Sequence, residues 1–324
     1  MSLRLLLRFV VLAAVIGAGY LLFQTLRQYT LAEIWSAMRA IPVTNLLLGL
    51  AFAFASYACL SCFDALGVRY TGKRLPLYKT ALASFVSLSI GHNVGIAALS
   101  SGAVRYRYYA RWGLTTEDVA KIVLFCGVTV ALGLMTLGGA SLLLRPQDAA
   151  DMTGLSRSAI FMIGIVSLIA PVVYLVLAAV VKTPLKLRSW TFEMPSLPIA
   201  AAQILVGTIN FAFVAASLHQ MLSAFAEASY LKVASVSIIA NVAAIISHVP
   251  GGIGVLEATV AHILPGAESV AAVIAFRVIY YFIPLAIGLP TLLISELIMK
   301  NKPGEAKPRE THEALDAGAL PSRS

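Results

Sequence analysis

Long, closely spaced apolar runs constrain the fold of this chain more than any other feature of its sequence. The polar stretches between them are too short to hold a folded soluble domain. Because only helices and closed barrels satisfy their backbone groups in lipid, we predict an all-α polytopic membrane protein. Six runs reach the roughly 20 residues that a helix needs to cross a bilayer: 5–26, 43–66, 120–144, 158–181, 198–222 and 269–299.

Charged residues are scarce and concentrated at the C-terminus. Lys, Arg, Asp and Glu form 12% of the 324 residues, about half of their usual share in a soluble domain. Nine of these charges fall in the last 25 residues. We therefore predict one transmembrane domain over 1–299 and a disordered cytoplasmic tail over 300–324. The apolar run from Leu5 to Phe23 lacks a small-residue cleavage site, so we expect it to be kept as a first helix.

Motifs for catalysis, metal binding and cofactor binding are missing from the sequence. Cys59, Cys62 and Cys126 lie inside apolar runs, where packing is their expected role. There is no Walker loop, no His-Glu-x-x-His and no Gly-x-Ser-x-Gly. We therefore expect a chain that is not an enzyme and needs no cofactor or metal. The basic residues lie in short loops that topology explains, so we expect no nucleic-acid partner.

Two further apolar stretches, 78–104 and 231–264, are interrupted midway by residues that break helices. The first contains Ser89-Ile-Gly-His-Asn-Val-Gly95, and the second contains Ser247-His-Val-Pro-Gly-Gly-Ile-Gly254. Each pattern predicts two half-helices that meet at a break.

The basic residues indicate that both interrupted stretches turn back instead of crossing. With two hairpins, twelve of 17 basic loop residues face one side, among them Arg111 and Lys186, while five, including Arg145 and Lys232, face the other. If the first stretch crossed, the split would be nine to eight. Because cytoplasmic loops carry the excess of Lys and Arg, we predict cytoplasmic termini, a first hairpin entering from the cytoplasm and a second from outside.

The opposite entry sides of the hairpins predict an inverted repeat. A full span, a broken hairpin, a polar turn and a full span follow one another over 43–144 and again over 198–299. The complete fold would then hold about six full transmembrane helices and two re-entrant broken-helix hairpins. Inverted repeats with discontinuous helices are typical of transporters, which bind substrate at the repeat interface. The alternative is that the duplicated helices only pack together.

The hairpin tips are the first candidate site. Exposed backbone at a tip cannot face hydrocarbon, so the tips must line a cavity or be buried in protein. Half-helices beginning near Val94 and Ile253 would point their free N–H groups at an anion such as a lipid phosphate. The candidate substrate-binding residues at the two tips are His92, Asn93, His248, Gly251 and Gly252.

Charged residues within the apolar runs are the second candidate site, because charge at bilayer depth is costly and usually functional or paired. Glu257 lies about one turn after the second break, and Arg277 lies within the last span, with Tyr281 four residues later on the same helix face. We expect Glu257 and Arg277 to be partners on a substrate path, the alternative being a purely structural ion pair. Asp64 is expected to pair with Arg69 in a structural role.

The segment after the first hairpin is the third candidate. Arg105, at the mouth of this hairpin, is expected to bind a lipid headgroup. Positions 105, 108, 109 and 112 share one helix face, which predicts an amphipathic surface for anionic lipid. For Arg111 and Trp112, an interfacial anchor is the expected role.

Two long motifs in this order resemble a known family. The motifs are Ser89-Ile-Gly-His-Asn-Val-Gly-Ile-Ala-Ala-Leu-Ser-Ser-Gly-Ala-Val-Arg-Tyr-Arg-Tyr-Tyr109, which continues into Arg111-Trp-Gly-Leu-Thr-Thr-Glu-Asp-Val-Ala120, and Pro250-Gly-Gly-Ile-Gly-Val-Leu-Glu257 with Arg277-Val-Ile-Tyr-Tyr281. Over about residues 10–299, the chain resembles the lysylphosphatidylglycerol synthase transmembrane region, which is the membrane half of the bacterial multiple peptide resistance factor.

The resemblance implies a lipid flippase of the bacterial cytoplasmic membrane that moves lysyl- or alanyl-phosphatidylglycerol outward and so confers resistance to antimicrobial peptides. Full-length members also carry a cytosolic domain that transfers the amino acid from tRNA. This sequence ends 25 residues after the last predicted span. We therefore expect the flippase function without the synthase function.

Three functional interpretations stay open. In the first, an anionic or aminoacylated phospholipid enters beside Arg105, is held by its phosphate between the half-helices, and leaves past Glu257 and Arg277. In the second, the chain is the membrane anchor of an aminoacyl-phosphatidylglycerol synthase whose catalytic domain is encoded separately. In the third, it is a scaffold that binds a partner or a second copy of itself without transport.

Overall fold

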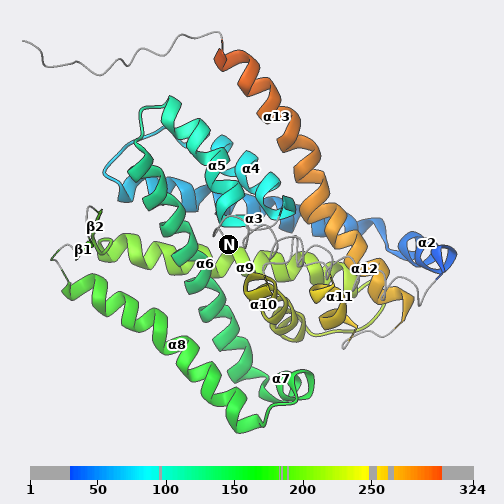
Figure 1. Cartoon of the computed structure of the whole chain (residues 1–324). Coiled ribbons are helices and arrows are strands. Elements are labelled where there is room, and N and C mark those ends of the chain that lie inside the picture. The colour runs from blue at the N-terminus through cyan, green and yellow to red at the C-terminus, as the bar shows by residue number, and fades with distance from the viewer. Residues whose placement is uncertain are drawn as a thin grey trace, which may run out of the picture.

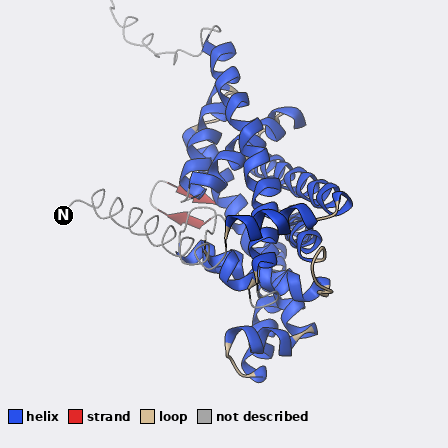
Figure 2. Cartoon of the chain, turned by 90° about the vertical axis from the view of Figure 1, so that its right-hand side faces the viewer, coloured by secondary structure: helices blue, strands red, loops and turns tan. Residues whose placement is uncertain are grey.

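The computed structural model describes residues 30–94, 97–181, 183, 185–187, 190–247, 254–261 and 266–300. These residues are mostly helical, with one small sheet (Figures 1 and 2). The helices are α2 (Leu31–Ala40), α3 (Val43–Tyr70), α4 (Leu77–Val94), α5 (Ala97–Arg111), α6 (Thr116–Leu144), α7 (Pro146–Thr153), α8 (Arg157–Val180), α9 (Leu197–Leu222), α10 (Tyr230–Ser247), α11 (Val255–Val260), α12 (Ala267–Arg277) and α13 (Ile283–Lys300), and the π-helical segment η2 (Val278–Phe282) joins the last two.

Among the described residues, five helical segments are long and apolar enough to cross a membrane: α3, α6, α8, α9 and the continuous 267–298. They coincide with five of the six predicted spans, while the sixth, 5–26, lies outside the described residues. The broken stretches form the shorter pairs α4 with α5 and α10 with α11. The helical membrane fold is therefore confirmed at this level.

One element departs from the all-α prediction. Strands β1 (Leu185–Leu187) and β2 (Trp190–Phe192) pair antiparallel, with Leu185 opposite Phe192. Each strand alternates apolar and polar residues, a period that favours a strand over a helix. The pair lies between α8 and α9, in the loop predicted to be polar and cytoplasmic.

Helix α8 shows the surface that the protein offers to lipid. It packs against α6 and α9 along one side. Its other side exposes large apolar side chains, among them Met162 at 59% and Val166 at 61%. Continuous apolar surface of this extent is not stable in water and indicates contact with lipid.

Helices α3 and α9 form the centre of the bundle and are joined by polar contacts. Near one end of the pair, Asn45 Nδ2 donates to the Gln220 carbonyl oxygen at 2.9 Å. In the middle, Ser56 Oγ donates to Asn210 Oδ1 at 2.7 Å. Such interhelical hydrogen bonds hold neighbouring helices in register inside a membrane.

The broken stretches pack reciprocally on the bundle. Helix α4 packs against α13, and α10 packs against α6. Both contacts use a glycine for close approach, since a Cβ atom at Gly288 would overlap Ser89 Oγ and one at Gly138 would lie 2.9 Å from Ile238. Each broken stretch therefore contacts the last long helix of the other predicted repeat half.

The two ends of the first broken stretch lie at the same end of the molecule. The rings of Tyr70, at the end of α3, and Phe125, in the first third of α6, stack with centroids 5.2 Å apart. The chain from 71 to 115 thus leaves and returns on one side, as Figure 1 also shows. In the second half, α9 ends beside the start of α3, and α12 begins beside α2, which precedes α3.

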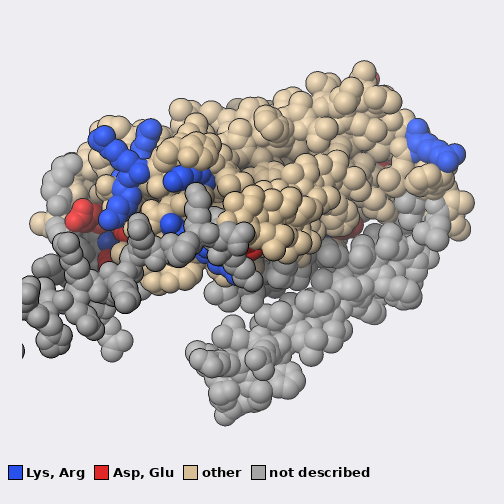
Figure 3. All heavy atoms as spheres, turned by 90° about the horizontal axis from the view of Figure 1, so that it is seen from above, with Lys and Arg blue, Asp and Glu red and all other residues tan. Residues whose placement is uncertain are grey.

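Helix α2 is a short amphipathic helix at the opposite end from β1 and β2 (Figure 1). Thr30 and Glu33 form a capping box at its start, and the hydrogen bonds from Thr30 lower the pKa of the Glu33 carboxyl. The guanidinium of Arg39 lies 4.9 Å from the centre of the Trp35 ring. In Figure 3, Lys and Arg side chains gather at one end, basic atoms appear again at the opposite end, and the surface between is mostly uncharged.

Candidate functional site

The predicted pairing of Glu257 and Arg277 is confirmed. Arg277 Nε donates to Glu257 Oε1 at 2.8 Å, and Arg277 Nη2 donates to Oε2 at 3.0 Å. The two side chains are only 5% and 10% exposed. The pair joins α11, directly after the second break, to the last turn of α12. Two planar groups that match in this bidentate way make a strong, oriented contact.

The start of α11 already has an anionic partner. Gly254 adopts a left-handed φ of +80°, and its N–H donates to Glu257 Oε2 at 2.8 Å. We expected this N-terminus to offer its N–H groups to a phosphate. In this conformation the Glu257 carboxylate takes that place, because it lies three residues into the helix, where a side chain reaches back to the cap.

The expected partner of Asp64 is wrong, while its structural role stands. Asp64 pairs with Arg105 and not with Arg69, through Nε to Oδ1 at 2.8 Å and Nη2 to Oδ2 at 2.9 Å. Tyr109 donates its hydroxyl to the same carboxylate at 2.8 Å, and Ser101 Oγ accepts from Arg105 Nη1 at 2.9 Å. Arg105 is 3% exposed, so in this state it holds α5 on α3 and presents no charge to lipid.

The outward face of α5 also differs from the prediction. Tyr108 and Tyr109 are buried at 1% and 0%, so the face shared by 105, 108 and 109 points into the protein. Arg107 and Arg111 point outward instead and pair with Glu296 of α13 at 3.1 Å and 2.8 Å. The face of α5 that carries Arg105 is buried because Asp64 on α3 provides a counter-charge for it.

Aromatic rings surround His92 in the last turn of α4. Its ring centre lies 6.2 Å from those of Tyr57 and Tyr280 and 6.1 Å from that of Tyr281. Its Nδ1 atom is buried and has no hydrogen-bond partner among the described residues. His92 thus has, at the first break, a polar atom without a hydrogen bond to any described residue. The aromatic rings around it would attract a cation.

Two backbone carbonyls of the π-helical segment accept hydrogen bonds from this cluster. Pro284 has no N–H, so the carbonyl of Tyr280 loses its ordinary helical donor. Tyr57 Oη donates to that carbonyl at 3.3 Å, while Asn93 Nδ2 donates to the Tyr281 carbonyl at 3.3 Å and to Ser89 O at 2.8 Å. A π-helical turn of this kind often marks a functional site.

The structure thus joins five of the predicted residues into one region, in which Glu257 and Arg277 are buried and the others are half-buried. Tyr281 connects its two parts, since its ring lies 6.1 Å from His92 and 5.9 Å from the Arg277 guanidinium. The members are His92, Asn93, Glu257, Arg277 and Tyr281.

The remaining predicted residues lie elsewhere. Arg105 belongs to the separate Asp64 cluster, and His248, Gly251 and Gly252 lie outside the described residues. Sequence reasoning missed Tyr57, because one tyrosine inside a long apolar run carries no distinguishing pattern. Among the described residues, no group of three His, Cys, Asp or Glu side chains is placed to hold a metal ion.

Comparison with known proteins identifies the family of the chain. Residues 10–288, which include both buried ion pairs, match the model of a family described as the lysylphosphatidylglycerol synthase TM region. The uncharacterized protein slr0712 of Synechocystis is 32% identical, over 86% of this chain and 87% of its own. The inner membrane protein YbhN of Escherichia coli is 29% identical, over 82% of this chain and 84% of its own. The chain is a multi-pass inner-membrane protein and belongs to the lysylphosphatidylglycerol synthase transmembrane region family.

Proposed function

We propose that this chain is a phospholipid translocase that moves aminoacylated phosphatidylglycerol, lysyl or alanyl, from the inner to the outer leaflet. The observation that carries the proposal is the buried Glu257–Arg277 pair directly after a break in a helix. Ionisable groups at bilayer depth are costly and usually mark a substrate or ion pathway. No catalytic step is assigned to the chain.

Two re-entrant hairpins in an inverted repeat form the framework of the proposal. The segment 71–115 returns to the end of the molecule that it left, which supports the prediction of the first hairpin. The reciprocal packing of α4 on α13 and of α10 on α6 supports two halves related by a pseudo-two-fold axis. With the basic residues counted above, this framework puts both termini in the cytoplasm.

The substrate would open the ion pair by supplying both counter-charges. The ammonium of the aminoacyl group would meet Glu257, and the phosphate would meet Arg277 and the N–H of Gly254, which the carboxylate now occupies. Leaving either charge unpaired at this depth costs about 3–5 kcal/mol. A headgroup with both charges avoids this cost, whereas a headgroup with one does not.

A pair of single substitutions tests this exchange. Glu257→Gln should strongly reduce outer-leaflet lysyl-phosphatidylglycerol and reduce phosphatidylglycerol less, because only the cationic headgroup needs the carboxylate. Arg277→Gln should reduce both. The measurement is leaflet-resolved lipid labelling in cells that make both lipids. Equal losses for the two lipids in Glu257→Gln would leave this residue as a structural partner only.

The charge-swapped double variant Glu257→Arg with Arg277→Glu is the control for folding. It keeps one charge of each sign, so the amount of folded protein should be higher than in the single variants. Size exclusion in detergent measures this amount. It exchanges the positions of the ammonium and phosphate sites, so transport should stay low. Recovery of transport together with folding would contradict a role in headgroup recognition.

A second candidate function follows from the description of the family. The chain would anchor an aminoacyl-phosphatidylglycerol synthase supplied as a separate protein. Deleting the chain would then lower the total amount of aminoacylated lipid, whereas loss of a translocase changes only its distribution between the leaflets. The same labelling experiment, with total lipid quantified, separates the two functions and also tests a scaffold that transports nothing.

A further inference from the structure

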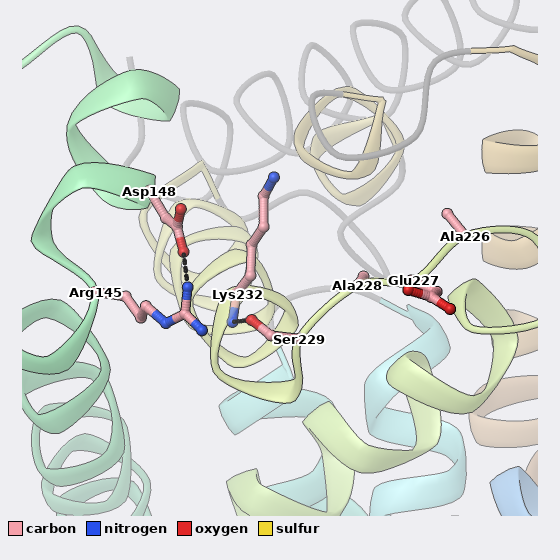
Figure 4. Close-up of a pocket in the computed structure, with 7 residues that line it drawn as sticks. All are labelled: Arg145, Asp148, Ala226, Glu227, Ala228, Ser229 and Lys232. Carbon is pink, nitrogen blue, oxygen red and sulfur yellow. Dashed lines mark hydrogen bonds and ion pairs between the residues drawn. The ribbon is translucent and has the colours of Figure 1, made fainter.

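A polar pocket of about 310 Å³ lies where the end of α6 meets the loop before α10 (Figure 4). It is at the opposite end of α8 from the strand pair, beside α7 (Figure 1). In the proposed topology this is the outer side of the membrane. The lining residues come from both halves of the chain: Arg145, Asp148, Ala226, Glu227, Ala228, Ser229 and Lys232.

Two basic side chains of the pocket, Arg145 and Lys232, are suited to a phosphate. Arg145 follows the last residue of α6, and its side chain is 48% exposed. Lys232 lies in the first turn of α10, and its ammonium has no hydrogen bond or ion pair within the part of the chain that the structure describes. The 18-residue helix α10 begins at this pocket, where Ser229 Oγ accepts the N–H of Lys232 at 3.4 Å. A helix start adds positive potential to the two side chains.

Two acidic side chains of the pocket, Asp148 and Glu227, are suited to an ammonium group. Asp148 makes a loose contact with Arg145, with Oδ2 3.7 Å from Nη1. This oxygen is buried, yet it accepts no hydrogen bond from any described residue. Among the described residues, the ion pair at 3.7 Å leaves this oxygen without a hydrogen bond, which a bound ammonium would supply. The exposed Glu227 adds a second negative charge to the pocket.

The surroundings put the pocket at the level of lipid headgroups. An apolar groove of about 460 Å³ adjoins the same corner of α6 and includes Leu144 and Phe161. Their side chains are 65% and 47% exposed, as expected of residues that face hydrocarbon. Arg145 directly follows Leu144, so the chain passes from lipid-facing to polar surface at this pocket.

We infer that this pocket binds the zwitterionic headgroup of a phospholipid, with the phosphate between Arg145 and Lys232 and a primary ammonium on Asp148. Aminoacylated phosphatidylglycerol and phosphatidylethanolamine share this chemistry. The inference rests on the proposed function and adds to it a docking site on the outer side, where a translocated headgroup is released. Because both halves line the pocket, a movement of one half against the other would change its shape.

Native mass spectrometry of the purified full chain in detergent tests the inference. The probes are dihexanoyl phosphatidylethanolamine, which has both charges, and dihexanoyl phosphatidylglycerol, which lacks the ammonium. Arg145→Gln and Lys232→Gln should each weaken binding of both lipids about tenfold, the effect of one lost charge-assisted hydrogen bond. Asp148→Asn should weaken only phosphatidylethanolamine. Arg157→Gln, at the same end of the molecule but in the apolar groove, should change neither affinity.

Three outcomes would overturn the inference. The first is unchanged binding in both Arg145→Gln and Lys232→Gln. The second is equal weakening of the two lipids by Asp148→Asn. The third is full displacement of phosphatidylethanolamine by inorganic phosphate at equal concentration, which would mean recognition of an anion alone. Glu257→Gln separates this result from the proposed function, since it should stop transport of lysyl lipid while this pocket still binds. Normal transport in that variant would refute the pathway past Glu257 and Arg277. It would not affect the assignment of headgroup binding to the pocket at Arg145 and Lys232.

Discussion

Asp64 shows how one buried carboxylate positions a helix in this protein. It accepts hydrogen bonds from both Arg105 and Tyr109, and its side chain is 0% exposed. The three residues connect α3 with α5, the second helix of the first broken stretch. In the other broken stretch, α11 carries Glu257, which is held by Arg277. In this conformation, therefore, a buried ion pair fixes the second helix of each broken stretch.

Replacing Asp64 by Asn should destabilise the protein by about 3–5 kcal/mol, because Arg105 is left as an unpaired buried charge. The double variant Asp64→Leu with Arg105→Met removes both charges and should regain much of this loss. Thermal unfolding in detergent, followed by fluorescence-detected size exclusion, measures the difference. A single variant that melts like the unchanged protein would show that water reaches this cluster.

Close packing of glycines decides how the long helices meet. Gly133 of α6 faces Gly207 of α9 so closely that a Cβ atom added to Gly133 would collide with the Gly207 backbone. By contrast, Gly127 lies two turns earlier on α6 and has open space around its Cβ position. The same helix therefore offers a crowded and an uncrowded glycine for comparison.

Gly133→Ala should lower stability by about 1–3 kcal/mol, since α6 and α9 must separate to admit the methyl group. Gly127→Ala is the matched control, and it should be neutral or stabilise the protein by up to about 1 kcal/mol through higher helix propensity. The measurement is the melting temperature of both variants in the same detergent. Equal shifts for the two would contradict a tight helix crossing at Gly133.

The whole molecule has two ends of different character. The strand pair, the turn between α5 and α6 and the end of α3 lie at one end, whereas α2 and α7 lie at the other (Figure 1). The basic residues favour the first end as the cytoplasmic one. This orientation decides whether the pocket at Arg145 and Lys232 meets the outer leaflet.

Cysteine labelling determines the orientation directly. In a background with Cys59, Cys62 and Cys126 replaced by serine, single cysteines at 111 and 186 should react only after the membrane is opened. Cysteines at 145 and 232 should react with an impermeant reagent in intact spheroplasts. Labelling of position 111 from outside would refute the hairpin topology, because the first broken stretch would then cross the membrane.

The sequence predicted the features that depend on composition along the chain. It did not predict the features that depend on which faces of two helices meet in the bundle. Five spans follow from apolar length, and the Glu257–Arg277 pair follows from the scarcity of charge at depth. The partner of Arg105 could not be predicted in this way. Its choice depends on which face of α5 meets α3, and a buried Asp64 outweighs the amphipathic pattern of the tyrosines.

The packing of α4 on α13 has a consequence for the folding of the protein during its synthesis. These helices are separated by almost 200 residues of sequence, yet a glycine at 288 fits directly against Ser89. During synthesis, the flank of α4 that packs on α13 therefore stays uncovered until the last helix has emerged from the ribosome. A ribosome stalled just before α13 would expose that flank to membrane chaperones and proteases, so quality control of this protein would act late in its translation.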